Sequence, residues 1–249
     1  MASLIIIPKN DPNWETNSGI CGGSLISEYF VLSAAHCVSK VGDLVVPVKL
    51  GSVITAVFLN DSTGELFSAR DIFIHPTYVS SGGNPWYDIM LLKLNRKVEF
   101  NLNMRPICLN SIFNADNYSS VIVAGWGLTE ISKTSNAKHL QYAELRTDGE
   151  IIKTRCAQWY SKSRVPPSGQ RLLMCAGSPT TIKTPNYGDS GGPTMIPLND
   201  KCSNVYEQIA IITGIDNNTE VGNIAQLSFH LVLEPFIYWI ASTVWEDEF

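Results

Sequence analysis

The stretch Gly188-Asp189-Ser190-Gly191-Gly192 constrains this chain more than any other feature of its sequence. Glycine enters turns that other residues adopt only with strain, so the backbone can fold back sharply on both sides of Ser190. Such a turn can expose the serine hydroxyl and direct the N–H groups of Gly188 and Ser190 to one spot, where they would stabilise an oxyanion. Taken alone, however, the stretch more often marks a plain Gly-rich hairpin turn.

Two further residues fit a nucleophilic role for Ser190. His36 follows an apolar run and two alanines, which leave room to position an imidazole. Asp88 opens a second apolar run, where an unpaired carboxylate is costly to bury. An aspartate paired with a histidine holds the imidazole in the tautomer that can accept the serine proton. Each residue alone also fits a structural role, but together the three predict a Ser-His-Asp arrangement.

Several separate motifs resemble the trypsin/chymotrypsin family of serine proteases. The order His36, Asp88, Ser190 is the order of that family and differs from the orders in subtilisins and α/β-hydrolases. Further landmarks extend along most of the chain, at residues 21–26, 105–109, 124–127, 174–177 and 236–240. So many motifs in the family's order make a chance match negligible.

The resemblance implies a secreted serine endopeptidase that acts on polypeptides through an acyl-enzyme. In that family the residue matching His36 is general base and then general acid, and the residue matching Asp88 orients it. The resemblance also implies protein inhibitors as further partners, and it requires neither a metal nor an organic cofactor. Two other interpretations stay open: a protease-like binding or regulatory protein with a malformed pocket, and transfer chemistry on a non-peptide ester.

The fold expected from this resemblance is all-β, with two six-stranded antiparallel β-barrels and a short C-terminal helix. Short apolar runs separated by turn residues agree with it. Strands are predicted at residues 4–7, 45–46, 53–58, 121–123 and 209–212, and a helical stretch near 147–160. A single domain over residues 1–249 would then comprise a first barrel at 1–112, a second at 113–234 and the helix at 235–245.

Composition excludes some partners. The chain has 23 acidic and 18 basic residues and a net charge of −5, whereas nucleic-acid binding needs a basic surface. No apolar run approaches the length that spans a membrane, and residues 4–7 are too short for the core of a signal peptide. The sequence therefore predicts neither nucleic acid nor a membrane as partner.

Six cysteines could hold a metal, but no Cys-x-x-Cys spacing supports a zinc site. The resemblance instead implies disulfides Cys21–Cys37 and Cys156–Cys175. Cys108 either tethers the domain to a preceding light chain or regulatory domain, or pairs with Cys202. Disulfides imply an oxidising compartment, and the glycosylation sequons at Asn60, Asn117 and Asn217 are consistent with secretion.

The start of the chain departs from the family pattern. Residues 1–4 resemble a strand that lies about a dozen residues inside the family's mature N-terminus. In the family, the amino group freed by activation cleavage pairs with the aspartate matching Asp189 and organises the oxyanion hole and the pocket. We expect the sequence to be a fragment of a longer precursor, with the alternative that the product begins here in a zymogen-like state.

The specificity pocket departs as well. Thr184 occupies the floor position that is aspartate in trypsin-like members, so a preference for Arg or Lys is not expected. Asn186 replaces a pocket cysteine, and Tyr187 precedes the nucleophile turn. By an approximate alignment, residues 214–219 take the place of the strand along the pocket. Asn217 then stands for a serine near the catalytic aspartate and Asn218 for a tryptophan, while Thr219 and Gly222 complete the predicted pocket.

Overall fold

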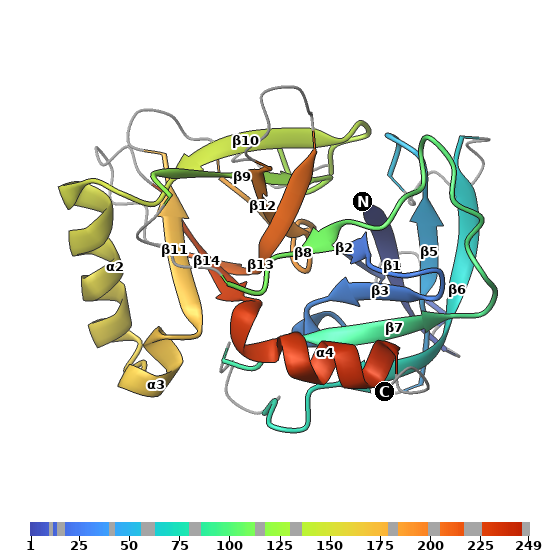
Figure 1. Cartoon of the computed structure of the whole chain (residues 1–249), viewed down its shortest axis with the longest axis horizontal. Coiled ribbons are helices and arrows are strands. Elements are labelled where there is room, and N and C mark those ends of the chain that lie inside the picture. Colours follow the sequence, from blue (N-terminus) through green and yellow to red (C-terminus); the bar gives the residue numbers. More distant parts are fainter. Residues whose placement is uncertain are drawn as a thin grey trace.

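The computed structural model describes most of the chain, and Figure 1 shows its two barrels side by side. The described residues are 1–9, 12–13, 18–39, 43–55, 63–79, 86–112, 118–129, 136–178, 184–198, 205–216 and 226–245. The statements below concern these residues.

Six antiparallel strands close the first barrel. Their spatial order is β1-β2-β3-β7-β6-β5, and β5 pairs back with β1 to close the ring. The two-residue strand β4 adds to β1 outside the ring. The elements are β1 (Ala2–Pro8), β2 (Gly19–Leu25), β3 (Phe30–Ser33), β4 (Leu44–Val45), β5 (Pro47–Leu50), β6 (Glu65–Ile74) and β7 (Met90–Leu94), with the short helix η1 (Ala35–Cys37) after β3.

The second barrel repeats this plan. Its order is β12-β9-β10-β11-β14-β13, and β13 pairs back with β12. The elements are β9 (Ser120–Gly125), β10 (Gln141–Arg146), β11 (Leu173–Gly177), β12 (Pro193–Pro197), β13 (Tyr206–Ile215) and β14 (Leu227–Val232). The predicted pair of six-stranded antiparallel barrels is therefore confirmed.

Strand β8 (Cys108–Leu109) connects the two halves. It lies inside the range predicted for the first barrel, yet it pairs in parallel with β13 of the second. The chain at this point is already crossing between barrels. The predicted strand at residues 53–58 differs too, since its described part contributes only a single bridge, between Ile54 and His139.

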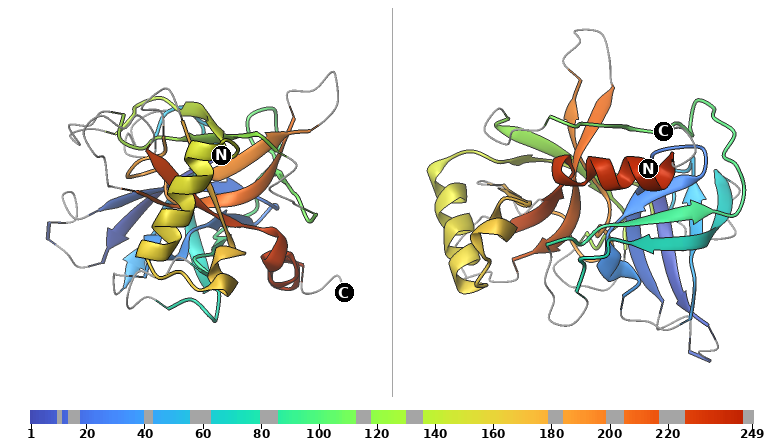
Figure 2. Two further views of the ribbon diagram at one scale, coloured as in Figure 1. Left: turned by 90° about the vertical axis from the view of Figure 1, so that its left-hand side faces the viewer. Right: turned by 60° about the horizontal axis from the view of Figure 1, so that its bottom comes forward.

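Helices lie outside both barrels. Helix α2 (Glu150–Lys162) and the short α3 (Pro167–Gln170) lie at the end of the second barrel remote from the first, as Figures 1 and 2 show. The chain ends in η3 (Glu234–Phe236) and α4 (Ile237–Val244), which matches the predicted C-terminal helix. Among the described residues, no helix combines the length and apolar character needed to cross a membrane.

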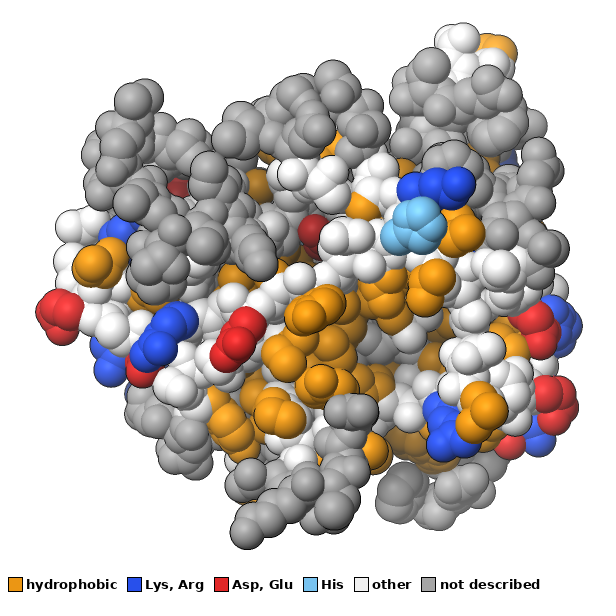
Figure 3. Space-filling view, turned by 90° about the horizontal axis from the view of Figure 1, so that it is seen from above, with side chains coloured by type: hydrophobic (Ala, Val, Ile, Leu, Met, Phe, Trp, Pro, Cys, Tyr) orange, Lys and Arg blue, Asp and Glu red, His pale blue; other side chains and the backbone are white. Residues whose placement is uncertain are grey.

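Four clusters of buried side chains form the core, and the smallest lies between α2 and the second barrel and contains Ile152, Cys156, Leu227 and Phe229. One fills the first barrel, with Leu4 and Phe67 among its members, and one fills the second, with Val123 and Ile209. The third joins the barrels to each other and to α4, and it contains Ile26, Phe30, Leu32, Ala34, Ile89, Leu91, Ile211, Leu231, Phe236 and Ile240. On the face in Figure 3, apolar side chains gather in the middle and charged ones towards the two ends.

A fully buried histidine lies in the second barrel. His230 Nδ1 lies 2.7 Å from Thr194 Oγ1, and its Nε2 lies 2.8 Å from Ser228 Oγ. Because the Ser228 hydroxyl donates to the Ala176 carbonyl, it accepts from His230, so Nε2 carries the proton and Nδ1 accepts from Thr194. Every polar atom of the neutral ring is thus satisfied, and burial lowers the pKa of His230 to about 3.

This network predicts loss of stability in acid. Between pH about 6.5 and about 3 the unfolded chain binds a proton at residue 230 that the folded chain does not, so unfolding becomes easier by up to about 1.4 kcal/mol for each pH unit of decrease. Equilibrium unfolding in urea across this range measures the slope. The variant His230→Gln keeps one donor and one acceptor, and its stability should depend less steeply on pH. Parallel curves for the two proteins would contradict the assignment.

Candidate active site

His36, in the short helix η1 after β3, and Asp88, just before β7, form a close pair. His36 Nδ1 lies 2.6 Å from Asp88 Oδ2, and the His36 backbone N–H donates to Asp88 Oδ1 at 2.8 Å. Asp88 is 2% exposed, whereas the His36 side chain is 31% exposed. A buried carboxylate that contacts both the ring and the backbone of one histidine fixes its orientation, and it leaves Nε2 to face outwards.

The backbone just before Asp88 is strained. Tyr87 has φ of +88°, a region that bulky residues rarely enter. Its ring stacks on His75 at 5.1 Å between centroids and meets Phe236 edge-on at 5.7 Å. Burial in this cluster lowers the pKa of His75. The aromatic packing thus holds a conformation that places Asp88 at the start of β7.

The turn at the serine follows the sequence expectation. Gly188 and Gly191 have φ of +98° and +80°, where only glycine is free of strain. A side chain at Gly188 would also overlap the Asn136 amide. Neither the Gly188 N–H nor the Ser190 N–H donates a hydrogen bond to a described residue. Two backbone donors are therefore free on either side of Asp189.

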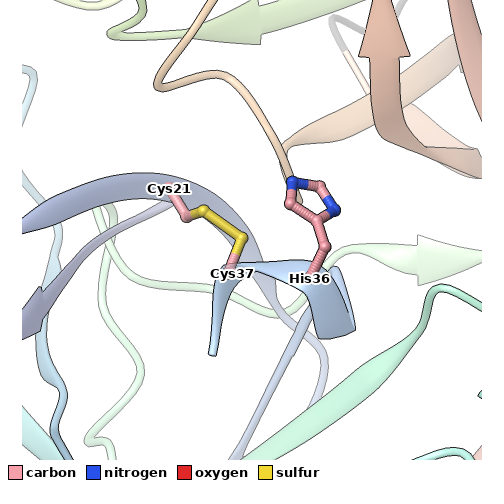
Figure 4. Close-up of side chains that lie close together, drawn as sticks. All are labelled: Cys21, His36 and Cys37. Atoms are coloured by element: carbon pink, nitrogen blue, oxygen red, sulfur yellow. A yellow bond between two sulfur atoms is a disulfide. The ribbon is translucent and has the colours of Figure 1, made fainter. Parts of the chain in front are cut away.

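The serine turn packs tightly on the segment that carries His36. The Gly22 N–H donates to the Ser190 carbonyl at 2.7 Å, and a side chain at Gly191 would overlap Ser33 Oγ. Gly22 adjoins Cys21, whose disulfide to Cys37 has a Cα–Cα distance of 6.4 Å. Figure 4 shows His36 next to this disulfide. Residues far apart in sequence are thereby brought to one place.

The same cluster is unsuited to a metal. Ligand atoms of Cys21, His36 and Cys37 lie within 4.8 Å of one another. Both sulfurs, however, are bonded to each other, so neither offers the thiolate that zinc requires. Within the described residues no other such cluster of His, Cys, Asp and Glu was found.

Asp189 lies beneath the serine turn beside a cavity. Its Oδ1 accepts from the Gly127 N–H at 2.7 Å and its Oδ2 from the Asn186 N–H at 2.8 Å. Burial raises the pKa of Asp189 to about 6, against the opposing effect of these two donors. The cavity beside it has a volume of about 330 Å³, and no Lys, Arg or His lines it. The carboxylate therefore lacks a cationic partner among the lining residues.

The predicted pocket residues fall into two groups. Thr184 lines the cavity beside Asp189, and its hydroxyl is buried without a hydrogen-bond partner. Tyr187 is 49% exposed, and its carbonyl accepts from the Leu128 N–H at 2.9 Å. The other four, Asn217, Asn218, Thr219 and Gly222, lie outside the described residues, as do the sequon residues Asn60 and Asn117.

Sequence reasoning predicted the strand at residues 209–212 but misplaced the segment that runs beside the Ser190 turn. The Gly191 N–H donates to the Ile212 carbonyl at 2.8 Å, and the Ile212 N–H donates to the Gly192 carbonyl at 3.0 Å. The next residue, Thr213, donates its hydroxyl to the Phe229 carbonyl. β13 ends at Ile215, so the strand in contact with the turn lies earlier than the expected segment 214–219. The apolar run at 209–212, followed by Thr213 and Gly214, was the available signal.

Two of the expected disulfides are present, Cys21–Cys37 and Cys156–Cys175. The alternative pairing of Cys108 with Cys202 is not formed, because Cys108 is a free, exposed cysteine. Its position on the short strand β8 turns its side chain to the surface. Cys202 itself lies outside the described residues.

Comparison with known proteins agrees with the fold. The family model described as Trypsin matches residues 12–240, which include every strand of both barrels except β1. The chain belongs to the trypsin family of serine proteases. Its two barrels are therefore those of a serine-protease domain.

Relatives of this trypsin-family chain include several arthropod proteases. "Serine protease snk" of Drosophila melanogaster is 37% identical over 202 residues, covering 78% of this chain and 42% of the relative. "Phenoloxidase-activating factor 1" of Holotrichia diomphalia is 31% identical over 75% of this chain and 52% of the relative. "Chymotrypsin-like elastase family member 1" of the dog is 32% identical over 73% and 66%. The chain thus spans about half the length of the arthropod relatives.

Gly127 provides a test of how the site is held. A side chain at Gly127 would overlap the Asp189 carboxylate, so Gly127→Ala must displace the turn that carries Ser190. We expect Ser190 labelling by a fluorophosphonate to slow at least about 100-fold, the effect of losing one oxyanion donor. Gly19→Ala is the matched control, since a methyl group there lies 3.8 Å from Ile6 Cβ. Equal labelling of the two variants, both folded by thermal melting, would refute this role.

Proposed function

We propose that this chain is the catalytic domain of a secreted serine endopeptidase, with His36, Asp88 and Ser190 as its triad. The observation that carries the proposal is the 2.6 Å contact between Nδ1 of the partly exposed His36 imidazole and Oδ2 of the buried Asp88 carboxylate. It gains support from the packing of the Ser190 turn against the segment that carries His36. The two disulfides support an oxidising compartment and hence secretion.

The proposed reaction has two halves. Ser190 Oγ attacks the peptide carbonyl while His36 takes the hydroxyl proton and passes it to the departing amine, which leaves an acyl-enzyme. A water molecule then gives its proton to His36 and attacks the acyl carbon, which releases the acid and restores Ser190. The free N–H groups of Gly188 and Ser190 stabilise the oxyanion in both halves, each by about 3 kcal/mol.

The floor of the pocket supports a preference for uncharged residues. By the family resemblance Thr184 lies at the floor of the specificity pocket, and its neutral hydroxyl offers no counter-charge to a basic side chain. The nearby Asp189 carboxylate is proposed to pair with a freed amino group instead, and burying an unpaired charge is costly. The pocket therefore suits an apolar or small polar side chain on the acyl side of the scissile bond.

Asp189 supports an activation step. We infer that a cationic group, an amino group freed by cleavage upstream, occupies the cavity beside Asp189 and pairs with its carboxylate. Cys108 is the proposed attachment point for a light chain or upstream regulatory domain, because its thiol is free and exposed. Polypeptide substrates and protein inhibitors are the proposed partners.

A second candidate function is a protease-like binding or regulatory protein. The cavity beside Asp189 favours it, because a buried carboxylate without a cation leaves the serine turn poorly supported. The two candidates differ in one property, the reactivity of Ser190.

Labelling with a fluorophosphonate tests the triad. The chain, and a form extended upstream and cleaved to free an amino terminus, should be compared with their Ser190→Ala counterparts. We expect the cleaved form to label rapidly. In that form Asp88→Asn should lower kcat for peptide cleavage about 10⁴-fold, because the imidazole then holds the wrong tautomer. If neither form reacts at Ser190, the binding-protein function replaces the protease.

Cleavage of a peptide library tests the pocket. We expect kcat/KM to be at least about tenfold higher for an uncharged residue before the scissile bond than for Arg or Lys. The variant Thr184→Asp supplies a carboxylate and should reverse this order. A wild-type preference for Arg or Lys would show that another residue provides the counter-charge.

A further inference from the structure

One segment of this acidic chain is strongly basic. Residues 151–188 contain six cations and no Asp or Glu, although the whole chain has a net charge of −5. The six are Lys153, Arg155, Lys162, Arg164, Arg171 and Lys183. Such a concentration attracts anions to one part of the molecule.

Most of these cations lie on and around α2 and α3, at the end of the second barrel remote from the first (Figures 1 and 2). Arg155 lies 4.0 Å from Asp216, so part of its charge is compensated. Lys153 and Arg164 form no ion pair with a described residue. Both are exposed, and their charges are available to a ligand.

Lys153 and Arg164 line the same groove. It has a volume of about 690 Å³ and lies between α2 and β11. Its apolar lining comes from Ala157, Val165, Leu173, Met174 and the Cys156–Cys175 disulfide. The rest of the lining is polar and includes Thr147, Ser161 and Gln170. A groove of this volume that combines apolar side chains with a few charged groups is typical of ligand sites.

Neither Lys153 nor Arg164 is the residue that its backbone position favours most. Lys153 lies in the first turn of α2, as its N–H bond to the Gly149 carbonyl shows, where the helix dipole disfavours positive charge. Arg164 has φ of +53° just after the helix, and the Val165 N–H donates to the Tyr160 carbonyl. This is a helix end at which glycine is the favoured residue. Lys153 thus opposes the helix dipole, and Arg164 strains the backbone although its charge is favoured at the helix C-terminus.

We propose that this groove binds an acidic peptide segment of a second protein, with an apolar side chain seated between Lys153 and Arg164. The two cations pair with carboxylates, and the apolar lining receives the side chain. A sulfated polysaccharide would match the charge but has no apolar group for the lining. The site is separate from the catalytic residues and does not rest on the proposed reaction.

Fluorescence anisotropy with a labelled peptide Glu-Asp-Phe-Glu-Leu tests the proposal, in the Ser190→Ala chain so that the probe stays intact. We expect Lys153→Gln and Arg164→Gly each to weaken binding about tenfold, as loss of a charge-assisted contact does. Arg164→Gly also relieves the left-handed backbone, so it should raise the melting temperature and cannot lose binding by unfolding. Ala157→Phe fills the groove without changing charge and should abolish binding.

The matched control is the pair Lys162→Gln and Arg171→Gln, which removes two charges from the same end of the molecule but outside the groove. At about 0.15 M salt, where charges beyond about 8 Å are screened, it should change binding less than about twofold. The proposal would be overturned if this control lost as much binding affinity as Lys153→Gln and Arg164→Gly. It would also be overturned if the uncharged peptide Gln-Asn-Phe-Gln-Leu bound as tightly as the acidic one. Binding of a heparin oligosaccharide but not of the acidic peptide would also overturn it and assign the surface to polysaccharide.

Discussion

The carboxylate of Asp189 is the constraint on which the site depends. Its two oxygens hold the Gly127 and Asn186 N–H groups, and these contacts fix the loops on both sides of the serine turn. Gly125 and Gly127 must lack side chains because the carboxylate fills that space. Burial raises the pKa of Asp189 to about 6, so a positive charge in the cavity beside it would further stabilise the ionised carboxylate. The Asp189 carboxylate thus supports the turn that carries the N–H groups of Gly188 and Ser190, the proposed oxyanion donors.

The two barrels contribute to the site by meeting at their edges. His36 and Asp88 come from the first barrel, and the Ser190 turn leads into β12 of the second. The cluster that joins the barrels includes the fully buried Ala34 and Ile89. Ala34 lies two residues before His36, and Ile89 directly follows Asp88. Packing that stabilises the barrel interface therefore also sets the distance between His36 and the Ser190 turn, and α4 reinforces it through Phe236 and Ile240.

Much of the fold and part of the site could be predicted from sequence, and the failures have a physical cause. The glycines around Ser190 allow a sharp turn, and the alanines before His36 leave room for its ring. Both features depend on local sequence, so they could be predicted from it. The strand beside the nucleophile was displaced in the prediction, because register is set by hydrogen bonds such as Gly191 to Ile212, which leave no mark on the sequence. The pairing of Cys108 was equally undetermined, since a cysteine does not reveal its partner.

Residues that are poor choices for stability gather at a few places in this molecule. Tyr87 adopts a glycine-like backbone beside Asp88, Thr184 buries a hydroxyl without a partner, and Arg164 stands at a helix end that suits glycine. Each costs folding energy that a simple substitution would recover. Sequences keep such costs mainly where a site needs them, at functional positions. Two of these residues lie at the proposed active site, and the third lies in a groove at the opposite end of the second barrel, which is a reason to expect binding there as well.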